Sequence, residues 1–357
     1  GSIVAVGAPL NNDNGVDSGH VKVYQFNGLS WLQLGANING EFESDQLGFS
    51  VSLSSNGAKL AIGANKNDSN EHRVLEYNLT TPYDISTRSA AGPNERCILD
   101  GVAAKTLYDL EFSSDGMKLF TTTRDAGSDL ADADKAYSFD LTLPYDVSTC
   151  TLASQTTDLD SSTFTSGSLA GNFDHAGSQN RKHRLQGIEI NNDGTKLFLI
   201  WMDAADADVG ARLFEYTLST PYDLTTLSLV TTAGIELSVS TTNGVENPAS
   251  MRFSSNGKRI FVISHDSTDA GITQISLDTV YDTSSYKIDG RVNLFSAVSP
   301  NNKEPRGVAF NSSGLKLYIG SDFNWDSETE ANDGDNPDQV LEFDLVCPFN
   351  IFVGKCP

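Results

Sequence analysis

The sequence lacks features that would place it in several common classes. No apolar run reaches the roughly 18 residues that a membrane-spanning helix needs, so membrane insertion is not expected. Basic residues are scarce, since 24 Lys and Arg stand against 47 Asp and Glu and give a net charge of −23. A surface with this charge repels nucleic acid and anionic lipid. Nucleic acid is therefore not an expected partner.

Local catalytic motifs are also missing. The five histidines have no zinc-site spacing such as His-Glu-x-x-His, and the sequence contains neither a Gly-x-Ser-x-Gly elbow nor a phosphate-binding glycine loop. With 47 acidic residues, pairs of carboxylates are too numerous to be diagnostic. These absences favour a protein that is not an enzyme, although a site assembled from distant segments would leave no local pattern.

Cysteine is rare, with four residues in the chain. Cys347 and Cys356 are close enough in sequence to close a terminal loop, and we predict a disulfide between them. Cys97 and Cys150 lie near the outer strands of successive repeats, so they form a second plausible pair. Paired cysteines indicate an oxidising compartment.

What the sequence does contain is a repeat. Its first phrase is a Ser-Ser-Asp-Gly-like turn followed by a Lys or Arg and a short apolar strand, and it occurs at 52–62, 111–120, 189–199, 252–262 and 309–319. Its second phrase, of the type Val-Leu-Glu-Tyr-x-Leu-x-x-Pro-Tyr-Asp, follows at 74–85, 137–147, 213–224, 272–283 and 340–351. No stretch has a sustained helical period. Each unit therefore predicts four short antiparallel strands.

Four-stranded units repeated at this spacing are typical of a β-propeller. We predict an all-β, single-domain propeller of six blades, with seven as the alternative. The first unit begins inside the repeat and lacks its first strand, so we expect the chain to be a piece of a longer polypeptide. The predicted blades cover 1–41, 46–98, 106–155, 185–240, 248–298 and 305–357, with an insertion at 155–184.

Two known kinds of repeat resemble this chain. Val-Ala-Val-Gly-Ala-Pro at 4–9 and Gly-His-Val-Lys-Val-Tyr at 19–24 resemble the FG-GAP repeat of integrin α-subunit propellers and related bacterial surface proteins, over roughly residues 1–64. The Ser-Ser-Asp-Gly-x-Lys-Leu-Phe phrase is similar to repeats of large bacterial or phage surface proteins. The resemblance implies binding or scaffolding, as in adhesion, rather than chemistry.

Acidic residues gather in the long loops, which this repeat would place on one face of the propeller. Carboxylates at alternating positions are the hard oxygen ligands that Ca²⁺ takes, which makes Ca²⁺ the one candidate cofactor. The alternative is a set of solvated acidic loops without a metal. The candidate ligands are Asp129, Asp132 and Asp134 in one loop and Asp333, Asp335 and Asp338 in another.

The same loops hold the candidate partner contacts. Trp201, Phe323 and Trp325 offer aromatic rings for a sugar face or a protein interface, although Trp201 could instead continue a strand into the core. The insertion at 155–184 ends in the basic residues Arg181, Lys182 and Arg184. These residues would bind an acidic partner or neutralise the acidic face of their own molecule.

These features together predict a non-catalytic binding or structural module of an extracellular or cell-surface protein, as a component of an adhesin, appendage or fibre. The expected partner is a glycan or a protein, and copies of the chain itself are included among the proteins. Two alternatives stay open. One is a carbohydrate-active enzyme with a propeller active site, and the other is an architectural filament subunit.

Overall fold

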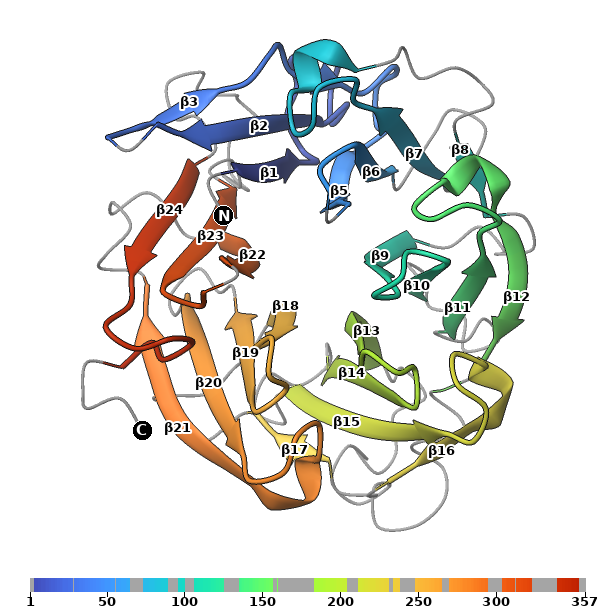
Figure 1. Ribbon diagram of the computed structural model, residues 1–357, viewed down its shortest axis with the longest axis vertical. Coiled ribbons are helices and arrows are strands. Elements are labelled where there is room, and N and C mark those ends of the chain that lie inside the picture. Colours follow the sequence, from blue (N-terminus) through green and yellow to red (C-terminus); the bar gives the residue numbers. More distant parts are fainter. Residues whose placement is uncertain are drawn as a thin grey trace. The chain divides into compact units, whose positions relative to one another are not determined.

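In the computed structural model the chain is almost entirely β-structure (Figure 1). It forms two compact units, one of Gly1–Ala126, Ala136–Gln155 and Glu328–Asn332, the other of Gly127–Lys135, Thr156–Ser327 and Asp333–Pro357. The structure describes residues 3–27, 29–54, 56–64, 73–88, 96–99, 106–124, 135–156, 159, 183–203, 211–230, 234–237, 248–264, 270–294, 304–311, 313–322 and 339–352.

The first unit contains three antiparallel sheets, each one blade. Strand order is β1-β2-β3 with β4 beside β2, then β5-β6-β7-β8, then β12-β11-β10-β9. The strands are β1 (Ile3–Ala8), β2 (His20–Phe26), β3 (Trp31–Gln33), β4 (Ile38–Asn39), β5 (Leu47–Leu53), β6 (Lys59–Ala64), β7 (Arg73–Asn78), β8 (Arg96–Ile98), β9 (Thr106–Phe112), β10 (Lys118–Arg124), β11 (Lys135–Asp140) and β12 (Thr151–Gln155).

The second unit also contains three blades. Strand order is β13-β14-β15-β16 with β17 beside β15, then β18-β19-β20-β21, then β22-β23-β24. The strands are β13 (His183–Ile190), β14 (Lys196–Asp203), β15 (Ala211–Leu218), β16 (Leu227–Leu229), β17 (Ile235–Glu236), β18 (Pro248–Phe253), β19 (Arg259–Ser264), β20 (Gly271–Leu277), β21 (Tyr286–Asn293), β22 (Glu304–Phe310), β23 (Lys316–Asp322) and β24 (Gln339–Asp344). Six blade sheets confirm the predicted all-β, six-bladed β-propeller class.

Each repeated glycine turn packs against the aromatic residue of the second phrase. In the third blade Gly116 has a φ of +72°, and a Cβ there would lie 2.4 Å from the ring of Tyr145. The Tyr145 N–H donates to the Gly116 carbonyl at 2.7 Å. Tyr145 itself has a φ of +60°. Glycine is thus required both by the backbone conformation and by the ring above it. The same pairing recurs as Gly57 with Tyr83, Gly194 with Tyr222, Gly257 with Tyr281 and Gly314 with Phe349.

The aspartate after that aromatic residue caps a short 3₁₀ helix. Asp146 accepts a hydrogen bond from Ser148 N at the start of η2 (Val147–Thr149). Asp84, Asp223 and Asp282 do the same for η1 (Ile85–Thr87), η3 (Leu224–Thr226) and η4 (Thr283–Ser285). A side-chain acceptor at this position satisfies an N–H that the helix leaves unpaired. The repeated Tyr-Asp dipeptide therefore has a local structural role.

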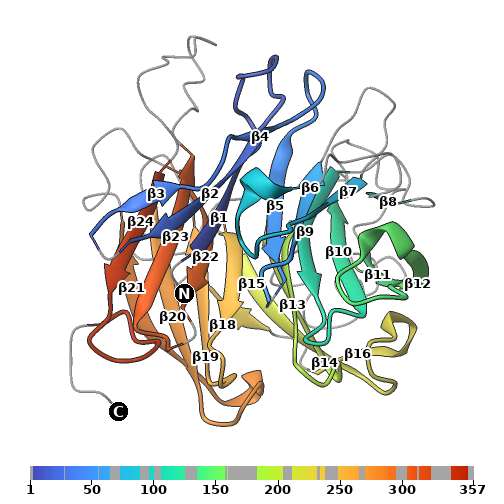
Figure 2. The same ribbon diagram turned by 45° about the horizontal axis from the view of Figure 1, so that its top comes forward.

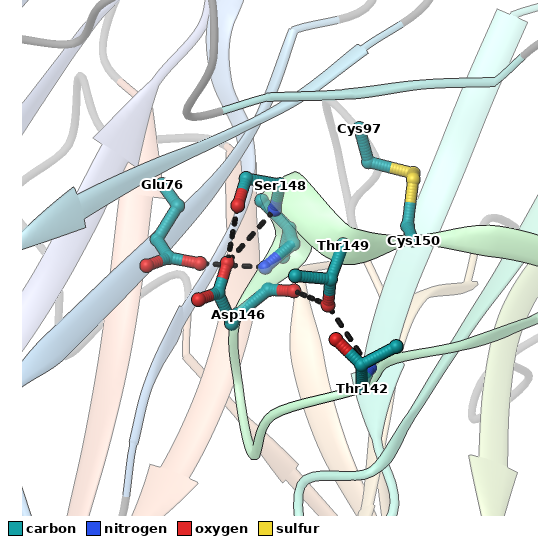
Figure 3. The surroundings of a disulfide bond; sticks show 8 residues. Glu76, Cys97, Thr142, Asp146, Ser148, Thr149 and Cys150 are labelled. Carbon is teal, nitrogen blue, oxygen red and sulfur yellow. Dashed lines mark hydrogen bonds between the residues drawn. A yellow bond between two sulfur atoms is a disulfide. The ribbon is translucent and has the colours of Figure 1, made fainter.

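A buried acidic residue in the third strand of a blade binds the 3₁₀ turn of the next blade. Glu76 in β7 accepts from Val147 N at 2.6 Å (Figure 3). Glu76 also pairs with Lys59 Nζ. Glu215 in β15 accepts from Thr283 N at 2.6 Å and pairs with Lys196 Nζ. Burial raises the pKa of Glu76, against the opposing effect of Lys59. We call this contact the interblade carboxylate bond.

One disulfide reinforces the same junction. Cys97 in β8 bonds to Cys150, which follows η2, so the bond joins the second and third blades (Figure 3). This pair, the second choice from the sequence, is confirmed. Cys347 is also disulfide-bonded, and Cys356, its predicted partner, lies outside the described residues. Disulfides indicate that the chain folds in an oxidising compartment.

Apolar side chains fill the space between neighbouring blades within each unit. Val21 and Val23 of β2 pack with Leu60 and Ile62 of β6, and all four are fully buried. Further clusters lie between the second and third, fourth and fifth, and fifth and sixth blades. Within the described part of the chain, no helix has the length and apolarity to cross a membrane.

Candidate functional site

Two loops of the first blade are bound closely together and form the candidate site. They are residues 9–19, between β1 and β2, and residues 40–46, between β4 and β5 (Figure 2). Ser44 N donates to Val16 O at 2.7 Å, and Gln46 N donates to Asp17 O at 2.9 Å. Asn14 Nδ2 donates to Gly40 O at 2.7 Å. We call these two segments the loop pair.

The backbone of the loop pair is strained. Asp17, Ser44 and Gln46 have φ values of 52°, 64° and 51°, a region that residues other than glycine seldom adopt. Among the described residues, every other non-glycine residue with positive φ is an aromatic residue of the repeated turns. Strain outside the repeat is therefore confined to this loop pair. Such conformations cost about 1 to 3 kcal/mol each and cluster at functional sites.

The first loop presents a carboxylate that a buried histidine holds. His20 Nδ1 lies 3.2 Å from Asp13 Oδ2, and the side chains are 2% and 49% exposed. Asn37 Nδ2 donates to the same oxygen at 3.3 Å. Asp13 Oδ1 has no hydrogen-bond partner among the described residues. One carboxylate oxygen is thus fixed, in a side chain that is half exposed.

The second loop presents the Glu41 carboxylate to solvent, beside the buried ion pair of Asp45 and Arg73. Asp45, 1% exposed, accepts hydrogen bonds from Glu41 N at 2.8 Å and Phe42 N at 2.9 Å. Its other oxygen lies 3.7 Å from Arg73 Nη2. The same nitrogen lies 3.6 Å from Oε2 of Glu41, which is 54% exposed. Burial raises the pKa of Asp45, and the two N–H donors and Arg73 oppose the shift.

The loop pair therefore combines two solvent-facing carboxylates with buried groups that fix their positions. Asp13 can take a proton from a bound water or hydroxyl group, and Glu41 can accept hydrogen bonds from a polar ligand. Among the described residues no group of three or more His, Cys, Asp or Glu could hold a metal ion. The groups on the loop pair supply a carboxylate base and hydrogen-bond acceptors.

None of the site residues predicted from the sequence belongs to the two segments of the loop pair. Trp201 is in β14 and fully buried, so it belongs to the core and cannot offer its ring to a partner. This corrects its assignment as a partner contact, because strand two continues further than the loop prediction assumed. Arg184 is in β13. The remaining candidates lie outside the described residues: Arg181, Lys182, Phe323, Trp325, Asp129, Asp132, Asp134, Asp333, Asp335 and Asp338.

The loop pair was not among the predicted site residues, although the sequence contains one signal for it. His20 and Arg73 begin the third strand of their repeats and pair in register with Ala8 and Ala64, the equivalent residues of two Gly-Ala dipeptides. Both are polar residues at positions where the repeat buries the side chain. A comparison of buried polar positions between repeats would have selected them.

No family model matches the chain, and no curated protein matches its sequence. Solved structures share its fold. One is a putative 6-phosphogluconolactonase from Bacteroides uniformis, with 15% identity, a TM-score of 0.50 and coverage of 96% of this chain and 79% of that one. Another is a putative 6-phosphogluconolactonase from Bacteroides fragilis, with 10% identity, a TM-score of 0.50 and coverage of 96% of both chains. At these identities the likeness shows the fold.

These structures overturn the prediction of a non-catalytic module that is not an enzyme. Two proteins of the same fold, matched over 79% and 96% of their own length, are named as putative 6-phosphogluconolactonases. The prediction relied on the absence of local catalytic motifs. A propeller can assemble a site from loops that are separated in sequence, so the absence of a local motif is no argument against catalysis.

Proposed function

We propose that the protein is a carbohydrate-active enzyme of the propeller fold that hydrolyses a neutral sugar lactone at the loop pair. The observation that carries this proposal is the Asp13 carboxylate, half exposed and held by the buried His20. The positive φ values of Asp17, Ser44 and Gln46 in the same loops support it. The lactonase names of the two fold neighbours are consistent with this class of reaction.

Asp13 is the catalytic base in this scheme. Its Oδ1 takes a proton from a water molecule while the water oxygen bonds to the lactone carbonyl carbon. The ester C–O bond then breaks, and the ring oxygen receives the proton from Asp13, which leaves an open-chain aldonic acid. No other reactant is needed. A positioned base of this kind contributes about 10²- to 10⁴-fold to a rate.

The buried groups hold the reacting carboxylate and the ligand in place. His20 donates its Nδ1 hydrogen to Asp13 Oδ2 and is a positioning residue. Arg73 lies against Glu41 and Asp45 and fixes the second loop. Glu41 is then placed to accept hydrogen bonds from substrate hydroxyl groups. Fixing these groups before the substrate binds lowers the entropy cost of reaching the reactive geometry.

The charge of the chain favours a neutral substrate. A net charge of −23 repels anions at a distance, and the two solvent-facing groups of the loop pair are carboxylates. Both effects would weaken the binding of a phosphorylated lactone. A lactone without a charged group meets neither, and its hydroxyl groups can donate to carboxylate oxygens.

The test is to follow acid release from D-glucono-1,5-lactone and other neutral aldonolactones in a pH-stat. We expect a rate above spontaneous hydrolysis that falls at least 100-fold in Asp13→Asn, because the base is lost and the shape is kept. The matched control is Asp140→Asn, which changes a 54% exposed carboxylate in the third blade. Equal activity of wild type and Asp13→Asn would reject Asp13 as the base. No release from any lactone would reject the proposed reaction.

Three finer features belong to the same proposal. We place the protein outside the cytoplasm, at the cell surface or beyond, and the Cys97–Cys150 disulfide supports an oxidising location. The likeness to FG-GAP repeats over roughly residues 1–64 supports a surface protein. Ca²⁺ binding at Asp333, Asp335 and Asp338 stays a prediction, and so does a glycan or protein partner.

A further inference from the structure

The loop pair also carries an exposed apolar surface. Phe42 is 45% exposed and Val16 is 56% exposed. They lie on neighbouring loops, since Ser44 N donates to Val16 O at 2.7 Å. Within the second loop, Asp45 N donates to Phe42 O at 3.3 Å. Single exposed apolar residues are common on protein surfaces. These two are unusual because they share their loops with the solvent-facing carboxylates.

The aromatic ring and one carboxylate are positioned by a single buried group. Asp45 Oδ2 accepts from the backbone N–H groups of both Glu41 and Phe42. The backbone that carries the Glu41 carboxylate and the Phe42 ring is thus held by one buried group. Gly15, whose Cβ would lie 3.3 Å from Glu43 Cβ, lets the first loop approach this turn closely. The surface is held before any ligand arrives.

An apolar ring on the same loops as solvent-facing carboxylates matches the surface of a pyranose. One face of a sugar ring exposes C–H groups that pack on the negatively polarised face of an aromatic ring. The hydroxyl groups at the rim donate charge-assisted hydrogen bonds to carboxylate oxygens. A quaternary ammonium ion would also fit an aromatic ring. Such a cation would bind less strongly here, because Arg73 lies beside Glu41 and partly offsets the negative charge of the Glu41 carboxylate.

We propose that Phe42 and Val16 form a subsite that binds the ring of a neutral pyranose, with Glu41 and Asp13 accepting hydrogen bonds from its hydroxyl groups. This inference rests on the proposed function, because it assigns the substrate class of the same site. It makes Phe42 a specificity residue that contacts the sugar ring. Asp45 is the positioning residue that sets Glu41 and Phe42 together.

The experiment uses 1,5-anhydro-D-glucitol, a neutral pyranose that has no carbonyl carbon to react. Binding is measured by saturation-transfer NMR titration of the whole chain. We expect Phe42→Ala to weaken binding at least tenfold and Phe42→Trp to restore it. The matched control is Leu29→Ala, which removes a 93% exposed apolar side chain from the same blade and should leave binding unchanged.

Each outcome bears on one claim. Equal affinity of wild type and Phe42→Ala overturns the subsite, and so does binding of tetramethylammonium without binding of the sugar. In the lactone assay Phe42→Ala should raise KM more than it lowers kcat. Lactone hydrolysis that Phe42→Ala leaves unchanged would reject the subsite and keep the proposed function. Sugar binding that depends on Phe42, without hydrolysis of any lactone, would keep the subsite and reject the reaction.

Discussion

Replacing Glu76 tests how neighbouring blades are joined. Glu76 is 1% exposed and makes two contacts: Oε2 accepts from Val147 N at 2.6 Å, and Oε1 pairs with Lys59. In Glu76→Ala the buried Val147 N–H loses its acceptor, which costs about 1 to 3 kcal/mol. Lys59 still has Asp146 Oδ2 at 3.6 Å in this variant, and its side chain is 22% exposed. The lost ion pair therefore adds about 1 kcal/mol or less to the destabilisation. We expect the free energy of unfolding of Glu76→Ala to be about 2 to 4 kcal/mol lower than that of wild type.

Glu76→Gln separates the hydrogen bond from the charge. A carboxamide oxygen can accept from the same N–H, as Gln274 Oε1 does at the equivalent position of the fifth blade, where it accepts from Ile351 N at 2.9 Å. The Gln variant should therefore stay within about 1 kcal/mol of wild type, because it loses the ion pair with Lys59 but also loses the cost of burying a charge.

The pH dependence of the two proteins should also differ. Burial raises the pKa of Glu76 above its ordinary value of 4.5. Well below pH 4.5 the group is protonated in both the folded and the unfolded state, so its titration does not change the free energy of unfolding there. As pH rises through the folded-state pKa, the carboxylate ionises in a site that favours the neutral form, so the free energy of unfolding falls. Glu76→Gln lacks this titration and should gain stability relative to wild type over that interval.

The assay is urea denaturation of oxidised wild type, Glu76→Ala and Glu76→Gln, followed by fluorescence at several pH values from 4 upward. Unchanged slopes with denaturant concentration would show that the variants unfold over the same surface. Equal losses in the Ala and Gln variants would refute the reasoning, because the hydrogen bond to Val147 would then contribute nothing. A stability difference between wild type and Gln that does not vary with pH would contradict the burial argument.

Two further predictions concern the repeat and its disulfide. Replacing Cys97 and Cys150 with Ala should lower the free energy of unfolding by about 4 kcal/mol in the loop-entropy relation, since the cysteines are 53 residues apart; an unchanged urea midpoint would contradict this. Gly116→Ala should lower the free energy of unfolding by more than about 2 kcal/mol, because the alanine would have a positive φ and its Cβ would clash with the Tyr145 ring. Gly307→Ala is the control, because a Cβ there meets nothing within 4 Å; equal melting temperatures of the two variants would refute the clash.

The repeat determined the blade structure without tertiary information. The turn glycines, the apolar alternation and the Pro-Tyr-Asp turns recur at regular spacing, and each defines a local conformation. The five glycines at the turns have φ values from 65° to 72°, which is what the Ser-Ser-Asp-Gly phrase requires. Local rules suffice here because hairpin turns and strand alternation depend on neighbouring residues.

Contacts over long sequence separations were decided by the tertiary structure. Whether Cys97 bonds to Cys150 depends on the packing of one blade's outer strand against the next blade's 3₁₀ turn. Trp201 was ambiguous in sequence because only strand length separates a loop tryptophan from a core tryptophan. The contact from Arg73 to Glu41 joins β7 to a loop of the first blade. No residue spacing encodes such a contact, since it forms only when this loop packs against the second blade and buries Arg73.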